Sequence, residues 1–252
     1  MSWLLALDFD GVIWDSVGEC YQVGRRTYEK LFGPLPELEH GFRRGRWLVR
    51  TGDDFYVVFR LLLENPDIDF EAMDKTAFLA QKLEWQANCE RFHREFYAAR
   101  EAQRENDFAT WASFQRPYPE FVAQLPRLRE MFSTVAICTT KDEASVARLL
   151  ATIGLDLPVY GKEFSTDKAV QMSRVCQEWN VAPAKVFFID DLMDNLLAVA
   201  PTGARPMLAA WGYNTPAEQS EAQQREIPVL GLEGLAEQLA ELKERYNLGP
   251  CA

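Results

Sequence analysis

The sequence has few histidines and no hydrophobic run long enough for a membrane helix. Only His40 and His93 occur among 252 residues, which leaves little room for a histidine base or a multi-histidine metal site. The longest apolar stretches, such as 56–63, which Arg60 interrupts, fall far short of the roughly 18 residues that a membrane helix needs. We therefore expect no membrane partner.

Paired cysteines, a leader segment and a basic surface are also missing. The five cysteines are spread along the chain without a CxxC spacing, a pattern that indicates reduced thiols. Residues 1–8 lack a basic region and reach a carboxylate after a short apolar run, so we expect no secretory signal. The net charge of −11 at pH 7 opposes binding to nucleic acid. These features predict a cytoplasmic protein.

The chain has the length and apolar content for one large domain, or for a domain with an insertion. Its residues are 48% hydrophobic, enough for an ample core. The apolar run 3–7 ends at Asp8-Phe9-Asp10-Gly11, which indicates a strand that is buried on both faces. Residues 16–113 instead have a helical composition, and we expect a long helix within 70–105, with Asp67 or Asp69 as its N-cap.

After residue 119 the pattern alternates between helices and strands. We expect helices at about 119–131, 142–153, 166–180, 192–200 and 233–245, and strands at about 133–138, 185–189, 206–210 and 228–230. Such alternation is typical of βαβ units. The sequence therefore predicts a three-layer, doubly wound (Rossmann-like) α/β domain, formed by 1–16 and 115–252, with an α-helical cap domain inserted at 17–114.

Polar residues follow the apolar runs, where ligands bind in open parallel sheets. They are Asp8 and Asp10, Thr139-Thr140-Lys141, Lys168 at the start of a later helix, and Asp190-Asp191. Carboxylates that converge in one crevice repel one another unless they are protonated or bridged by a cation. Mg²⁺ prefers oxygen ligands and commonly joins carboxylates to a substrate phosphate. We therefore expect a magnesium site.

These residues resemble the motifs of the haloacid dehalogenase-like hydrolases, in particular the helical-cap phosphatases similar to phosphoglycolate phosphatase. The segment Asp8-Phe9-Asp10-Gly11-Val12 matches the DxDG[TV] motif of that family at every defining position. The hydrophobic run that ends at Thr139 is similar to the second motif, and the pair Asp190-Asp191 looks like the acidic pair of the fourth. The resemblance covers about 1–16 and 115–240, and it extends to the cap only in position and helicity.

The resemblance implies a Mg²⁺-dependent hydrolase of small phosphomonoesters, with a small phosphorylated metabolite as its partner. Asp8 would be the nucleophile that forms an aspartyl-phosphate, and Asp10 would be the acid and base. Thr139 would donate a hydrogen bond to the phosphoryl group, and Lys168 would neutralise its charge. The implied metal ligands are Asp8, Asp10 through its backbone carbonyl, Asp191, and Asp190 through a metal-bound water.

Further residues are candidates for substrate binding. Gly11 permits a close approach of the substrate, and Thr140 is adjacent to Thr139 in the second motif. Arg46 and Arg50 belong to a basic run in the inserted domain. Their guanidinium groups suit phosphate or carboxylate, but a solvated or salt-bridged surface is the commoner explanation of such a run.

Several alternatives stay open at this level. Lys162 or Lys141 could replace Lys168 as the phosphate-neutralising residue, and a strand-end aspartate could simply cap the next helix. A phosphomutase, or another reaction of this family such as that of a phosphonatase or dehalogenase, is an alternative on the same scaffold, although Asp10 weighs against a dehalogenase. A non-catalytic phospho-acceptor module, similar to a response-regulator receiver, belongs to a different class. The acidic pair of a receiver, however, does not stand last along the chain, as Asp190-Asp191 does here. The oligomeric state and the physiological substrate cannot be read from the sequence.

Overall fold

The computed structural model describes residues 2–248, which form two compact units. The α/β unit comprises the described residues up to Asp15 and those from Pro117 onward, and the helical unit comprises Ser16–Arg116. The chain passes between the units at the short strands β2 (Trp14–Asp15) and β3 (Arg116–Pro117). Within residues 2–248, none of the helices has the length and apolar character needed to span a lipid bilayer.

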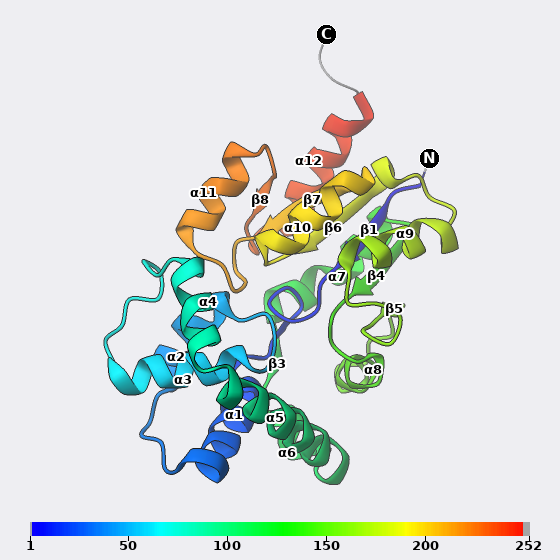
Figure 1. Cartoon of the computed structure of the whole chain (residues 1–252). Helices are drawn as coiled ribbons and strands as arrows, with labels where there is room; N and C mark the ends of the chain where they lie inside the picture. Colours follow the sequence, from blue (N-terminus) through cyan, green and yellow to red (C-terminus); the bar gives the residue numbers. More distant parts are fainter. Residues whose placement is uncertain (1, 249–252) are drawn as a thin grey trace. The chain divides into compact units, whose positions relative to one another are not determined.

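The α/β unit is built on a parallel sheet of six strands in the order β5-β4-β1-β6-β7-β8 (Figure 1). The strands are β1 (Leu4–Leu7), β4 (Thr134–Cys138), β5 (Val159–Tyr160), β6 (Val186–Asp190), β7 (Arg205–Ala209) and β8 (Val229–Leu230). The first strand is central, because Leu7 pairs with Ile137 of β4 on one side and with Ile189 of β6 on the other. The predicted α/β fold class is confirmed.

Helices cover both faces of this sheet. Phe188 of β6 belongs to a core cluster that includes Met172 of α9 and Leu196 of α10. The preceding residue, Phe187, points to the opposite face, where its ring lies 5.9 Å from that of Tyr246 in α12. Successive side chains of a strand alternate between faces. Because β6 presents apolar side chains to both faces, the sheet needs a layer of helices on each side, which gives three layers.

The helices of the α/β unit begin largely where the sequence predicts them. They are α7 (Pro119–Met131), α8 (Glu143–Ala151), α9 (Lys168–Glu178), α10 (Met193–Val199), α11 (Pro216–Gln224) and α12 (Leu235–Leu248). The carboxylate of Asp167 caps α9 by accepting hydrogen bonds from the amides of Ala169 and Val170, so Lys168 lies in the first turn. Strand β5 and helix α11 are not among the predicted elements.

The helical unit packs around an aromatic core. Its helices are α1 (Val17–Phe32), α2 (Glu39–Gly45), α3 (Asp54–Glu64), α4 (Lys75–Glu84), α5 (Gln86–Asn106) and α6 (Phe108–Ser113). The prediction of one long helix capped by Asp67 or Asp69 is wrong. Asp74 caps α4, because its side chain accepts from the amide of Thr76. The helical stretch is interrupted at Trp85, whose ring packs edge-on against that of Tyr56.

Candidate active site

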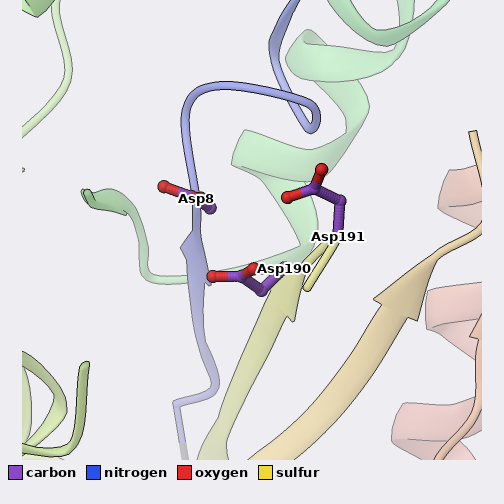
Figure 2. A group of neighbouring side chains, drawn as sticks. All are labelled: Asp8, Asp190 and Asp191. Carbon is purple, nitrogen blue, oxygen red and sulfur yellow. The ribbon is translucent and has the colours of Figure 1, made fainter. Parts of the chain in front are cut away.

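Three carboxylates converge at the carboxyl edge of the sheet. Asp8 directly follows β1, and Asp190 and Asp191 stand at the end of β6 (Figure 2). One carboxylate oxygen from each of the three residues lies within 4.8 Å of the other two. All three residues are buried, with exposed fractions of 6%, 0% and 1%. This convergence follows from the register, because adjacent parallel strands end at the same edge.

The Asp8 carboxylate lies against the ammonium group of Lys168. The Lys168 Nζ is 2.9 Å from Asp8 Oδ1 and 3.2 Å from Asp190 Oδ2. Burial raises the pKa of Asp8 to about 6, an effect that Lys168 opposes and that the carboxylates of Asp190 and Asp10 reinforce. Burial by itself would lower the pKa of Lys168, but Asp8 and Asp190 raise it above its ordinary value. The two acidic neighbours thus favour the charged form of Lys168, whereas burial shifts the pKa of Asp8 above its ordinary value.

Lys168 occupies an unfavourable end of its helix. The first turn of a helix carries positive dipole charge, which disfavours a cation there. Only 1% of the Lys168 side chain is exposed, and its Nζ donates a hydrogen bond to the carbonyl of Cys138 at 2.6 Å. Lys162 is exposed instead. Lys168 is thus the lysine that contacts Asp8 and Asp190, whereas Lys141 contacts Asp10.

Asp190 is held by several donors. Its Oδ1 accepts from the amide of Leu192 at 2.9 Å and from Asn195 Nδ2 at 3.0 Å, and its Oδ2 lies 3.0 Å from the same Asn195 nitrogen. These bonds tie Asp190 to residues at the start of α10, whose N-cap residue, Leu192, makes no side-chain capping bond. These donors fix the orientation of the Asp190 carboxylate, so it can in turn orient a ligand bound beside it.

Asp191 is enclosed by two glycines. A Cβ added to Gly11 would lie 2.2 Å from Asp191 Oδ2, and one added to Gly212 would lie 2.2 Å from Asp191 Cβ. Gly11 also has a φ of +84°, which other residues rarely adopt. The amide of Tyr213 donates to Asp191 Oδ2 at 2.7 Å. Both glycines are therefore required by the close approach of the carboxylate.

The second motif presents Thr139 at the end of β4. Thr139 is buried, and its Oγ1 accepts a hydrogen bond from the amide of Lys141 at 3.1 Å. Since the hydroxyl oxygen is the acceptor of that bond, its hydrogen is left to donate to another group. The Lys141 ammonium lies 3.1 Å from Asp10 Oδ1. Neighbouring Thr140 is exposed.

The donor set suits a hard divalent cation. Three buried carboxylates lie together, Lys168 pairs with two of them, Asp8 and Asp190, and burial raises the pKa of Asp8. Carboxylate oxygens are ligands of Mg²⁺ and Ca²⁺. The residues therefore fit a metal ion of this class.

The two candidate arginines lie in the helical unit. Arg46 Nη1 donates to the carbonyl of Val49 at 3.1 Å, and Arg50 Nη1 donates to the carbonyl of Trp47 at 2.6 Å. Both guanidinium groups thus hydrogen-bond to main-chain carbonyls nearby. Their contact with a substrate stays a prediction.

Sequence reasoning missed two features of the site. It gave Lys141 no role beyond that of a rival to Lys168, although Lys141 pairs with Asp10. It overlooked Gln171, which is fully buried and donates to the carbonyl of Thr139. The available signal for Gln171 was its spacing of three residues from Lys168, which places the two on one helix face.

Comparison with known proteins agrees with this geometry. A family model described as haloacid dehalogenase-like hydrolase matches residues 4–202. The chain therefore belongs to the haloacid dehalogenase-like hydrolases, a family of enzymes. No curated protein sequence matches the chain.

Solved structures show the same fold. A haloacid dehalogenase-like family hydrolase from Streptococcus pneumoniae is 17% identical, with a TM-score of 0.65 and coverage of 96% of this chain and 98% of the other. A protein described as a predicted phosphoglycolate phosphatase, from Haemophilus somnus, is 15% identical, with a TM-score of 0.63 and coverage of 94% and 98%. A protein described as a predicted phosphatase, from Clostridium acetobutylicum, is 12% identical, with a TM-score of 0.63 and coverage of 96% and 99%.

Proposed function

We propose that this protein is a Mg²⁺-dependent phosphatase of small phosphomonoesters that reacts through a phosphorylated Asp8. The observation that carries the proposal is the position of the Asp8 carboxylate at a strand end, 2.9 Å from Lys168 and in one cluster with Asp190 and Asp191. The structural neighbours described as phosphatases support the choice of substrate class.

In the first step the Asp8 carboxylate attacks phosphorus in line with the leaving oxygen. The bond from Asp8 Oδ to phosphorus forms as the ester P–O bond breaks, and the leaving oxygen takes a proton from Asp10. The Lys168 ammonium neutralises charge on the phosphoryl group, and the Thr139 hydroxyl donates to one of its oxygens. Phosphoryl transfer is catalysed mainly by positioning and charge stabilisation of this kind.

In the second step water hydrolyses the acyl phosphate on Asp8. Asp10, now a carboxylate, accepts a proton from the water as it attacks phosphorus, so free phosphate leaves and Asp8 is regenerated. Lys141 is the group that fixes Asp10 between the two steps, because its Nζ lies 3.1 and 3.4 Å from the two Asp10 oxygens.

The metal would be held by Asp8 and Asp191, with Asp190 orienting a coordinated water and Asp10 offering its backbone carbonyl. When bound, Mg²⁺ supplies positive charge to the substrate phosphate and relieves the repulsion among the carboxylates. Asp191 is well suited to this task, because the Tyr213 amide donates to its Oδ2 and the two glycines leave room for its carboxylate.

We further propose that the helical unit acts as the cap that selects the substrate and excludes water, a gating role known in many enzymes. Arg46 and Arg50 are the side chains of this unit that we assign to substrate binding. We propose a small phosphorylated metabolite as the substrate. We also propose that the protein acts in the cytoplasm.

The proposed function is tested by phosphate release from p-nitrophenyl phosphate. Wild-type protein should release phosphate with Mg²⁺ and stop when EDTA is added. The Asp8→Asn variant should lose activity by on the order of 10³-fold or more, because it removes the nucleophile. Steady hydrolysis by Asp8→Asn would defeat the mechanism. No release by the wild type across a panel of phosphorylated metabolites would favour a non-catalytic module.

A further inference from the structure

A buried glutamine links the second motif to helix α9. Gln171 is 0% exposed, and its side-chain nitrogen donates two hydrogen bonds. One goes to the carbonyl of Thr139 at 2.8 Å and the other to the carbonyl of Ser165 at 2.6 Å. The side chain therefore joins the end of β4 to the loop that leads into α9.

Gln171 lies beside Lys168 on one face of α9. The Lys168 Nζ donates to the carbonyl of Cys138 at 2.6 Å, and the Gln171 amide donates to that of the next residue, Thr139. The other side of this segment is held by β5, where the Thr139 amide donates to the carbonyl of Tyr160 at 3.0 Å. Thr139 is thus fixed through both its amide and its carbonyl.

An amide is the side chain that this position needs. Its nitrogen carries two donors, and both are used, whereas Gln171 Oε1 is buried without a hydrogen-bond partner. Turning the amide over would set its oxygen against two carbonyl oxygens. The same helix contributes Met172 and Val175 to the apolar core. An apolar residue at 171 would bury no unpartnered oxygen, but it would leave both carbonyls without this donor.

We propose that Gln171 is a positioning residue for phosphate binding. It fixes the distance between Thr139 and the start of α9, so that the Thr139 hydroxyl and the Lys168 ammonium reach one phosphoryl group together. This inference rests on the proposed function for the identity of the ligand. Gln171 itself touches no reacting atom, and its effect passes through the main chain of Thr139.

The test measures binding of inorganic phosphate by calorimetry, with Mg²⁺ present, in wild type and in Gln171→Met. Loss of the two Gln171 donors should weaken phosphate binding about tenfold, because a displaced Thr139 would lose its hydrogen bond to the charged phosphate, and one such bond typically contributes about this factor. Binding of Mg²⁺ alone should not change, because the clamp does not touch the carboxylates. Gln171→Asn, which keeps an amide but is too short to reach both carbonyls, should behave in the same way and serves if the methionine variant does not fold.

Two controls separate positioning from general destabilisation. Val175→Ala removes buried volume from the core face of the same helix, and it should lower the melting temperature without weakening phosphate binding. In a Thr139→Val background, Gln171→Met should weaken phosphate binding less than twofold further, because residues that act as a unit are not additive.

Four outcomes decide against the inference. Equal weakening of phosphate binding by Val175→Ala, full additivity with Thr139→Val, or loss of Mg²⁺ binding in Gln171→Met would each overturn it, as would a wild type that binds no phosphate. A wild type that binds phosphate but hydrolyses no phosphomonoester would end the proposed function alone, and the double-mutant cycle would still decide the role of Gln171.

Discussion

Both units of this protein bury charged side chains, but they differ in how those charges are matched. In the helical unit, the buried Glu19 carboxylate accepts from Arg100 Nε at 2.8 Å and Nη2 at 2.6 Å, and from Trp111 Nε1 at 2.9 Å. One acid thus meets one base. In the α/β unit, three buried carboxylates converge, and the Lys168 ammonium contacts two of them, Asp8 and Asp190.

This difference separates a structural cluster from a functional one. The Glu19–Arg100 pair ties α1 to α5, and the Trp111 bond adds α6, so the whole set of groups is satisfied within the fold. An excess of buried negative charge costs free energy unless a further cation arrives. Groups strained in this way concentrate at functional sites.

The largest effect on stability should come from breaking the matched pair. Arg100→Met leaves the Glu19 charge buried without its partner, which should lower the free energy of unfolding by about 3–5 kcal/mol. Urea denaturation measures this loss. Lys30→Met is the matched control, because Lys30 and Glu95 also join α1 to α5 but their side chains are 70% and 38% exposed, so its effect should be small. Equal losses in the two variants would show that burial of the Glu19–Arg100 pair does not increase its contribution to the free energy of unfolding.

A smaller effect of opposite sign should follow from removing a carboxylate at the cluster of Asp8, Asp190 and Asp191. In EDTA, Asp191→Asn should raise the free energy of unfolding by roughly 1 kcal/mol, because it relieves repulsion at a site kept for function. The asparagine oxygen can still accept from the Tyr213 amide. Thermal unfolding without metal checks the sign. A loss as large as that of Arg100→Met would mean that the three carboxylates are already balanced within the fold.

The sequence predicts the frame of the fold and most residues of the candidate site. Apolar runs that end in polar residues reveal both the strands and their carboxyl ends, which is why Asp8, Thr139 and Asp190 could be grouped before any coordinates were known. The break at Trp85 could not be predicted, because no glycine or proline marks it and tertiary packing of the ring against Tyr56 and Arg60 accompanies it.

Contacts between segments far apart in the sequence could not be predicted either. The bond from Gln171 to Thr139 joins residues 32 positions apart, and its existence depends on the register between α9 and β4. The strand β5 has only two residues, too few to produce an alternating pattern. Local patterns therefore predict which residues end each strand, whereas the side chains that fix those residues emerge only from three-dimensional packing.

The central claim is that the carboxylates of Asp8, Asp190 and Asp191 tolerate one another through a shared divalent cation. Calorimetric titration of metal-free protein with Mg²⁺ tests it directly, with Asp191→Asn as the comparison. We predict saturable binding of one ion per chain by the wild type and loss of that binding in Asp191→Asn. Absence of binding by the wild type at millimolar Mg²⁺, or equal binding by the variant, would contradict the account.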